Sequence, residues 1–142
     1  PGLGGTPAAP GIVGRWLSEG ADLAPLLADP PASIRRIEAT FGGDGRFRVV
    51  LTNDDLQSFE LSGTYTTDPA RDPATITLSQ AQPEAVRSTG IYRVDGDVLT
   101  YEVAQTDPPL AGVTPPDAAA GFGSTNNGAL GEANVQTYRR QP

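Results

Sequence analysis

The stretch QSFELSGTYT, residues 57–66, alternates between two kinds of side chain with a period of two. Phe59, Leu61, Gly63 and Tyr65 fall on one face, and the positions between them are serine, glutamate or threonine. Successive side chains of a β-strand point to opposite sides of a sheet, so this spacing is typical of a strand with one buried face. The stretch therefore predicts a strand that adds an apolar face to a core.

Further strand-like segments lie on both sides of this stretch. They are residues 13–18, 36–41, 45–52, 74–80, 86–94, 98–104 and 134–140. Glycine and aspartate, which tolerate the positive φ of tight hairpins, stand between several of them. About eight strands suit a small closed antiparallel barrel, which is the expected all-β fold, and they also suit a two-sheet sandwich.

Three segments do not follow the strand pattern. A short helix is expected over residues 22–28, capped by Asp22 and with Pro25 in its first turn. Residues 106–133 are rich in proline, glycine, alanine and asparagine, which predicts a long loop before the last strand. Its apolar residues Leu110 and Phe122 are expected to dock on the barrel as a lid. Residues 1–11 form an expected Pro/Gly-rich leader or tether, so the barrel domain is expected over 12–142.

The composition argues against catalysis. The chain contains no histidine, cysteine or lysine, and its ten basic residues are all arginine. A histidine base, a cysteine nucleophile, a lysine Schiff base and the usual zinc ligands are therefore missing, and no base exists to activate a serine. The turn acids Asp54, Asp55, Asp95 and Asp97 lack the spacing of a calcium loop and are interpreted as solvated. We expect neither an enzyme nor a bound metal or cofactor.

Charge and hydropathy also narrow the choice of partners. Seventeen acidic residues outnumber the dispersed arginines and give a net charge of −7, so nucleic-acid binding is not expected. No apolar run approaches the roughly 18 residues of a membrane span, so no transmembrane segment is expected. The lysine-free composition and the Pro/Gly-rich start favour a mature protein that is secreted or held at the cell surface, with a lipid anchor upstream of Pro1 as one hypothesis.

Several motifs resemble those of lipocalins. Gly14-Arg15-Trp16 resembles the Gly-x-Trp signature that opens the first lipocalin strand. A wider resemblance is to a bacterial family of uncharacterised lipocalin-like domains. It is carried by Gly63-Thr64-Tyr65, by the proline-bounded turn 68–73 and by the hairpin Ile91-Tyr92-Arg93-Val94-Asp95-Gly96-Asp97-Val98-Leu99. The resemblance implies a calycin-type barrel in an exported protein and offers no assigned activity.

The same resemblance implies how the barrel is closed. Trp16 would seal one end beside Gly14, and an arginine of the last strand, Arg139 or Arg140, would pack over the indole, with Arg139 taken as the barrel-closing residue.

Two function hypotheses follow. In the first, a non-catalytic exported barrel binds a small apolar molecule or lipid. Its expected interior residues are Phe47, Phe59, Leu61, Tyr65, Ile76, Leu78, Tyr92 and Tyr101. In the second, the barrel is filled, and the chain is a structural or self-assembling surface protein. Residues 1–11 and the 106–133 loop would then make the contacts between subunits.

Overall fold

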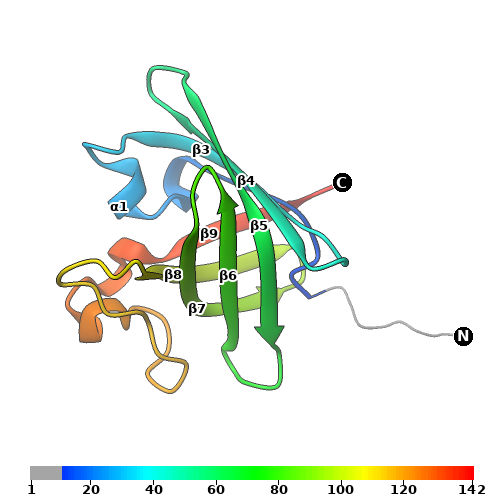
Figure 1. Ribbon diagram of the computed structural model, residues 1–142, viewed down its shortest axis with the longest axis vertical. Helices are drawn as coiled ribbons and strands as arrows, with labels where there is room; N and C mark the ends of the chain where they lie inside the picture. The colour runs from blue at the N-terminus through cyan, green and yellow to red at the C-terminus, as the bar shows by residue number, and fades with distance from the viewer. Residues whose placement is uncertain (1–10) are drawn as a thin grey trace, which may run out of the picture.

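The structure of the protein is a computed structural model that describes residues 11–142, so most of the expected leader lies outside the described residues. Eight antiparallel strands form a closed barrel in which each strand pairs with the next and the last pairs with the first (Figure 1). The expected eight-stranded barrel is confirmed, and the sandwich is ruled out. The strands are β2 (Gly14–Glu19), β3 (Ile34–Phe41), β4 (Arg46–Asn53), β5 (Ser58–Asp68), β6 (Ala74–Gln82), β7 (Val86–Asp95), β8 (Val98–Asp107) and β9 (Gln136–Gln141).

The strand register brings the apolar positions into a common interior. Trp16 stands opposite Ala39, Ala39 opposite Val49, and Val49 opposite Leu61, so one row of inward side chains crosses β2 to β5. Because side chains alternate along each strand, a row like this fixes which residues of all four strands point inward. The alternation seen in the sequence thus becomes a single enclosed core.

Two glycines let neighbouring strands approach closely where the sheet curves. A Cβ atom on Gly63 would lie 2.1 Å from the carbonyl oxygen of Ser79, next to a break in the register between β5 and β6. A Cβ atom on Gly90 would lie 2.1 Å from the carbonyl oxygen of Glu102. No other residue type fits these positions without moving backbone, which explains why Gly63 interrupts the apolar face of β5.

The helical segment differs from the expected helix over residues 22–28. The chain forms a 3₁₀ turn, η1 (Gly20–Asp22), and then a single α-helical turn, α1 (Pro25–Ala28), with Pro25 in its first turn as expected. Asp22 does not cap α1, whose N-cap is Ala24. The Ala24 amide instead donates to the side-chain oxygen of Gln136 on β9, which ties the segment to the barrel. No helix within residues 11–142 has the length and apolar character needed to cross a membrane.

The long loop between β8 and β9 packs on the outside of the barrel. It contains the 3₁₀ turns η2 (Thr125–Gly128) and η3 (Gly131–Asn134), and Figure 1 shows it, yellow to orange, beside β8. Glu102 of β8, which is fully buried, accepts hydrogen bonds from the Gly123 amide at 2.8 Å and from the Thr125 amide at 3.1 Å. The Thr125 hydroxyl donates to the same carboxyl at 2.5 Å. Since the neighbouring Tyr101 belongs to the core, Glu102 points outward, and the loop covers this outer face.

Candidate functional site

The barrel interior contains a cavity of about 290 Å³. Its wall is built mainly from inward apolar side chains of β3 to β8, including Ile37, Phe41, Phe47, Val49, Leu61, Leu78 and Val103. Leu51 and Val86 also line it, and they lie next to the turns that join β4 to β5 and β6 to β7. We call the end of the barrel with these two turns the open end.

The opposite end of the barrel is filled. Trp16, Ile76, Tyr92 and Leu99 are at most 5% exposed and belong to the core, yet none of them lines the cavity. We call this the closed end. The interior is therefore solid at one end and hollow at the other, whereas the sequence left a filled barrel and a hollow one as alternatives.

The expected interior residues divide between these two regions. Phe47, Leu61, Leu78 and Tyr101 line the cavity. Ile76 and Tyr92 are packed in the closed end and do not reach it. The expectation that they bind the ligand is not supported by their position.

Two further expected residues lie away from the cavity wall. Tyr65 packs its ring edge-on against Phe41 at 5.1 Å, and its hydroxyl donates to the carbonyl oxygen of Gly42 at 2.6 Å. Phe59 is 51% exposed, so its assignment to the buried interior is wrong. Alternation puts Phe59 on the same side of β5 as Leu61. Phe59 pairs with Leu51, however, and only one further pair follows before the β4–β5 ladder ends. Too few neighbouring side chains lie there to bury the Phe59 ring.

Several residues that line the cavity were not among the expected interior residues. Tyr138 and Gln136 of β9 line the wall, as do Ala39 and Phe41 of β3. Alternation along the expected strands could have identified these residues. It places Gln136 and Tyr138 on one face of 134–140, and Ala39 and Phe41 on one face of 36–41.

The arginine that packs on Trp16 is Arg140, which corrects the expectation for Arg139. The Arg140 guanidinium lies 4.3 Å from the centre of the indole ring, and the two residues are cross-strand partners. Arg139 points the other way and pairs with Asp22 at 3.1 Å. Adjacent residues of a strand occupy opposite faces, so only one of the two arginines can reach the indole.

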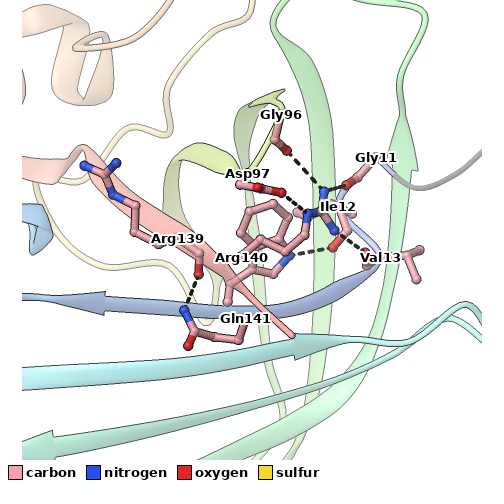
Figure 2. A network of polar contacts seen from close by, with 9 residues as sticks. Gly11, Ile12, Val13, Gly96, Asp97, Arg139, Arg140 and Gln141 are labelled. Carbon is pink, nitrogen blue, oxygen red and sulfur yellow. Dashed lines mark hydrogen bonds and ion pairs between the residues drawn. The ribbon is translucent and has the colours of Figure 1, made fainter.

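Arg140 also binds neighbouring segments of the chain at the closed end. Its guanidinium donates to the carbonyl oxygens of Gly11 and Val13, both at 3.1 Å, and pairs with Asp97 at 3.4 Å (Figure 2). Gly14 leaves room for this arrangement, because a Cβ atom there would lie 2.9 Å from Nη1 of Arg140. Gly14 and Trp16 thus take the barrel-closing positions expected for them, with Arg140 as their partner.

The expected lid does not cover the cavity. Leu110 is 48% exposed, and the Phe122 ring lies 5.4 Å from the guanidinium of Arg93, on the outer side of β7. The loop reaches the cavity wall through Asn134, whose side-chain amide donates to the carbonyl oxygen of Val103 at 2.9 Å. The lid expectation for Leu110 and Phe122 is wrong because Glu102 anchors the loop to the outer face.

The cavity wall carries polar groups but no charged ones. Among the described residues that line it, none is acidic or basic. Tyr101 and Tyr138 meet edge to face, with ring centres 5.7 Å apart. Burial raises the pKa of both phenols well above the ordinary value, and the Gln136 amide offsets only part of this effect at Tyr138. Both side chains therefore remain neutral hydroxyl groups at any physiological pH.

Comparison of the chain with protein-family models, with curated proteins and with solved structures finds no match.

Proposed function

We propose that this chain is a non-catalytic barrel protein that binds a small apolar molecule in the cavity at its open end. The observation that carries the proposal is the 290 Å³ space lined by aliphatic and aromatic side chains. Protein interiors pack to high density, with few voids larger than a water molecule. A space of this size at the open end of a barrel whose other end is well packed favours a binding site over a packing defect.

The chemistry of the chain supports a binding role over a catalytic one. The sequence supplies no histidine, cysteine or lysine, and no carboxylate lies on the cavity wall. A bound molecule would therefore meet no side chain suited to proton transfer or nucleophilic attack at physiological pH. As part of the same proposal the protein acts outside the cytoplasm, secreted or at the cell surface, which the lysine-free composition supports.

The alternative of a filled, self-assembling barrel has less support. The open end is hollow, and the 106–133 segment that was to contact other subunits is bound to its own barrel through Glu102. Residues 1–10, the other expected contact segment, lie outside the described residues.

Fluorescence titration with N-phenyl-1-naphthylamine, a neutral apolar probe, tests the proposal. We expect saturable binding to the wild-type protein and at least tenfold weaker binding to Ala39→Phe, which adds a ring where Ala39 lines the cavity. Thr40→Phe is the matched control, because Thr40 is the next residue of β3 and is exposed on the outer face. Equal binding by all three proteins, or none by the wild type, would refute a ligand site in the cavity.

A further inference from the structure

We propose that the molecule bound in the cavity is uncharged and carries one hydrogen-bonding oxygen, such as a ketone or alcohol oxygen, which meets the hydroxyls of Tyr101 and Tyr138. This inference rests on the proposed function and narrows its ligand class. It excludes fatty acids and other anionic lipids as the preferred ligands.

The absence of charge on the wall argues for an uncharged ligand. No arginine, aspartate or glutamate is found among the described residues that line the cavity, so a carboxylate drawn into it would be buried without a partner. Such burial costs several kcal/mol even after local relaxation. Arg140, the arginine at the closed end, is already engaged by Trp16 and by backbone carbonyls.

An anionic group left at the open end would not gain a favourable partner from the turns there. The turn between β4 and β5 contains Asp54 and Asp55, and the turn between β6 and β7 contains Glu84. These are the charged residues of the two turns, and all three are acidic. A carboxylate head at the mouth would therefore meet net negative charge from these two turns, and the exposed Arg87, which follows Val86, is the basic residue beside them in the chain.

The polar amides on the wall are already occupied by the protein. The Asn134 amide donates to the carbonyl of Val103 and to the Thr125 hydroxyl, and the Gln80 amide donates to the carbonyl of Glu84. The side-chain oxygen of Gln136 accepts the amide of Ala24. These bonds tie the segments around the barrel together and hold each of the three amides in place.

The two phenols differ from these amides. Tyr101 and Tyr138 are only 7% and 4% exposed and both line the cavity. The Gln136 amide interacts with the Tyr138 oxygen as a donor, but no hydrogen bond found within residues 11–142 is donated by the hydroxyl of Tyr101 or Tyr138, whereas the Tyr65 hydroxyl donates to Gly42. A buried phenol normally finds a hydrogen-bond partner, so an oxygen on the ligand would complete this part of the wall.

Three 2-substituted naphthalenes of similar size test the proposal by titration calorimetry at pH 7.5. They are 2-acetylnaphthalene, with a carbonyl oxygen, 2-ethylnaphthalene, without a polar group, and 2-naphthoate, with a negative charge. We expect 2-acetylnaphthalene to bind about three- to tenfold more tightly than 2-ethylnaphthalene, the gain of one neutral hydrogen bond. We expect 2-naphthoate to bind at least tenfold more weakly than 2-acetylnaphthalene.

Variants then assign the hydrogen bond to the phenols. The double variant Tyr101→Phe/Tyr138→Phe should bind 2-acetylnaphthalene and 2-ethylnaphthalene with equal affinity. Tyr65→Phe, which removes a hydroxyl outside the cavity, should keep the wild-type preference. A far-UV circular dichroism spectrum that matches the wild-type spectrum shows that the double variant is folded.

The outcomes separate this inference from the proposed function. Tight binding of 2-naphthoate, or a preference for the ketone that survives in the double variant, would overturn the inference. If N-phenyl-1-naphthylamine still bound in that case, the proposed binding site in the cavity would remain supported. Failure of the wild-type protein to bind any of the naphthalenes or N-phenyl-1-naphthylamine would overturn both.

Discussion

Replacing Arg140 by methionine tests how the closed end is held together. Methionine keeps an unbranched apolar chain against the indole of Trp16, so the variant mainly loses the guanidinium and its polar contacts. Those contacts are the face of the indole at 4.3 Å and the carbonyl oxygens of Gly11 and Val13 at 3.1 Å. The Arg140 side chain is only 22% exposed, so these contacts are partly shielded from water.

The cost of this substitution can be built up from its parts. A partly desolvated contact between guanidinium and indole contributes about 1 kcal/mol. Each of the two charge-assisted hydrogen bonds contributes about 1 kcal/mol, below the usual range for charged donors because the carbonyls can bind water in the variant. The pair with Asp97, which is 85% exposed, contributes little. We expect the free energy of unfolding to fall by about 3 kcal/mol, and Tm by about 10 °C for a domain of this size.

Urea unfolding followed by tryptophan fluorescence measures this loss, since Trp16 is the single tryptophan of the chain and lies in the affected region. Arg139→Met is the matched control, because Arg139 is the neighbouring residue of β9 and its partner Asp22 lies outside the closed end. We expect that variant to unfold at nearly the wild-type urea concentration. Equal effects of the two substitutions, or a loss below about 1 kcal/mol for Arg140→Met, would refute the role given to Arg140.

Three further predictions concern other buried polar groups. Burial raises the pKa of Tyr101 and Tyr138, so the folded state holds protons that the unfolded state releases above about pH 10. The stability that these two phenols contribute should therefore be fully present below that pH and be lost above it, and absorbance near 295 nm should show them ionising only as the protein unfolds. Glu102→Gln leaves one acceptor oxygen for the loop, so hydrogen exchange at Thr125 should accelerate at least tenfold while strand amides stay protected. The Ser18 hydroxyl is buried with no partner among the described residues, so Ser18→Ala should leave stability unchanged or raise it by up to about 1 kcal/mol in urea unfolding, and a clear loss would show a missed partner.

The barrel could be predicted from the sequence because strand alternation is a local property. In the stretch 57–66 the period of two depends only on neighbouring residues, and the same holds for the other strands. Phe59 shows the limit of this reasoning, because alternation gives the face of a side chain but not its depth along the barrel. Depth depends on where the paired ladder ends, which for Phe59 is one residue away.

The site was harder to predict because it depends on contacts between distant segments. Glu102 stands between Tyr101 and Val103 in a strand pattern, where an acid normally faces water, and nothing local indicates that the loop covers it. Alternation could have identified Arg140 and not Arg139 as the arginine that packs on Trp16, because Arg140 lies on the same face of the strand as Tyr138. The division of the interior into a filled and a hollow half depends on the summed volumes of side chains from eight strands, which one sequence does not display.

A crystal of the protein pressurised with xenon tests whether the barrel is hollow at its open end, because xenon enters apolar cavities and scatters strongly. We expect a xenon peak inside the barrel among Phe41, Leu78 and Tyr101, and none beside Trp16 at the closed end. An interior filled by side chains throughout, with no xenon bound at the open end, would contradict this expectation.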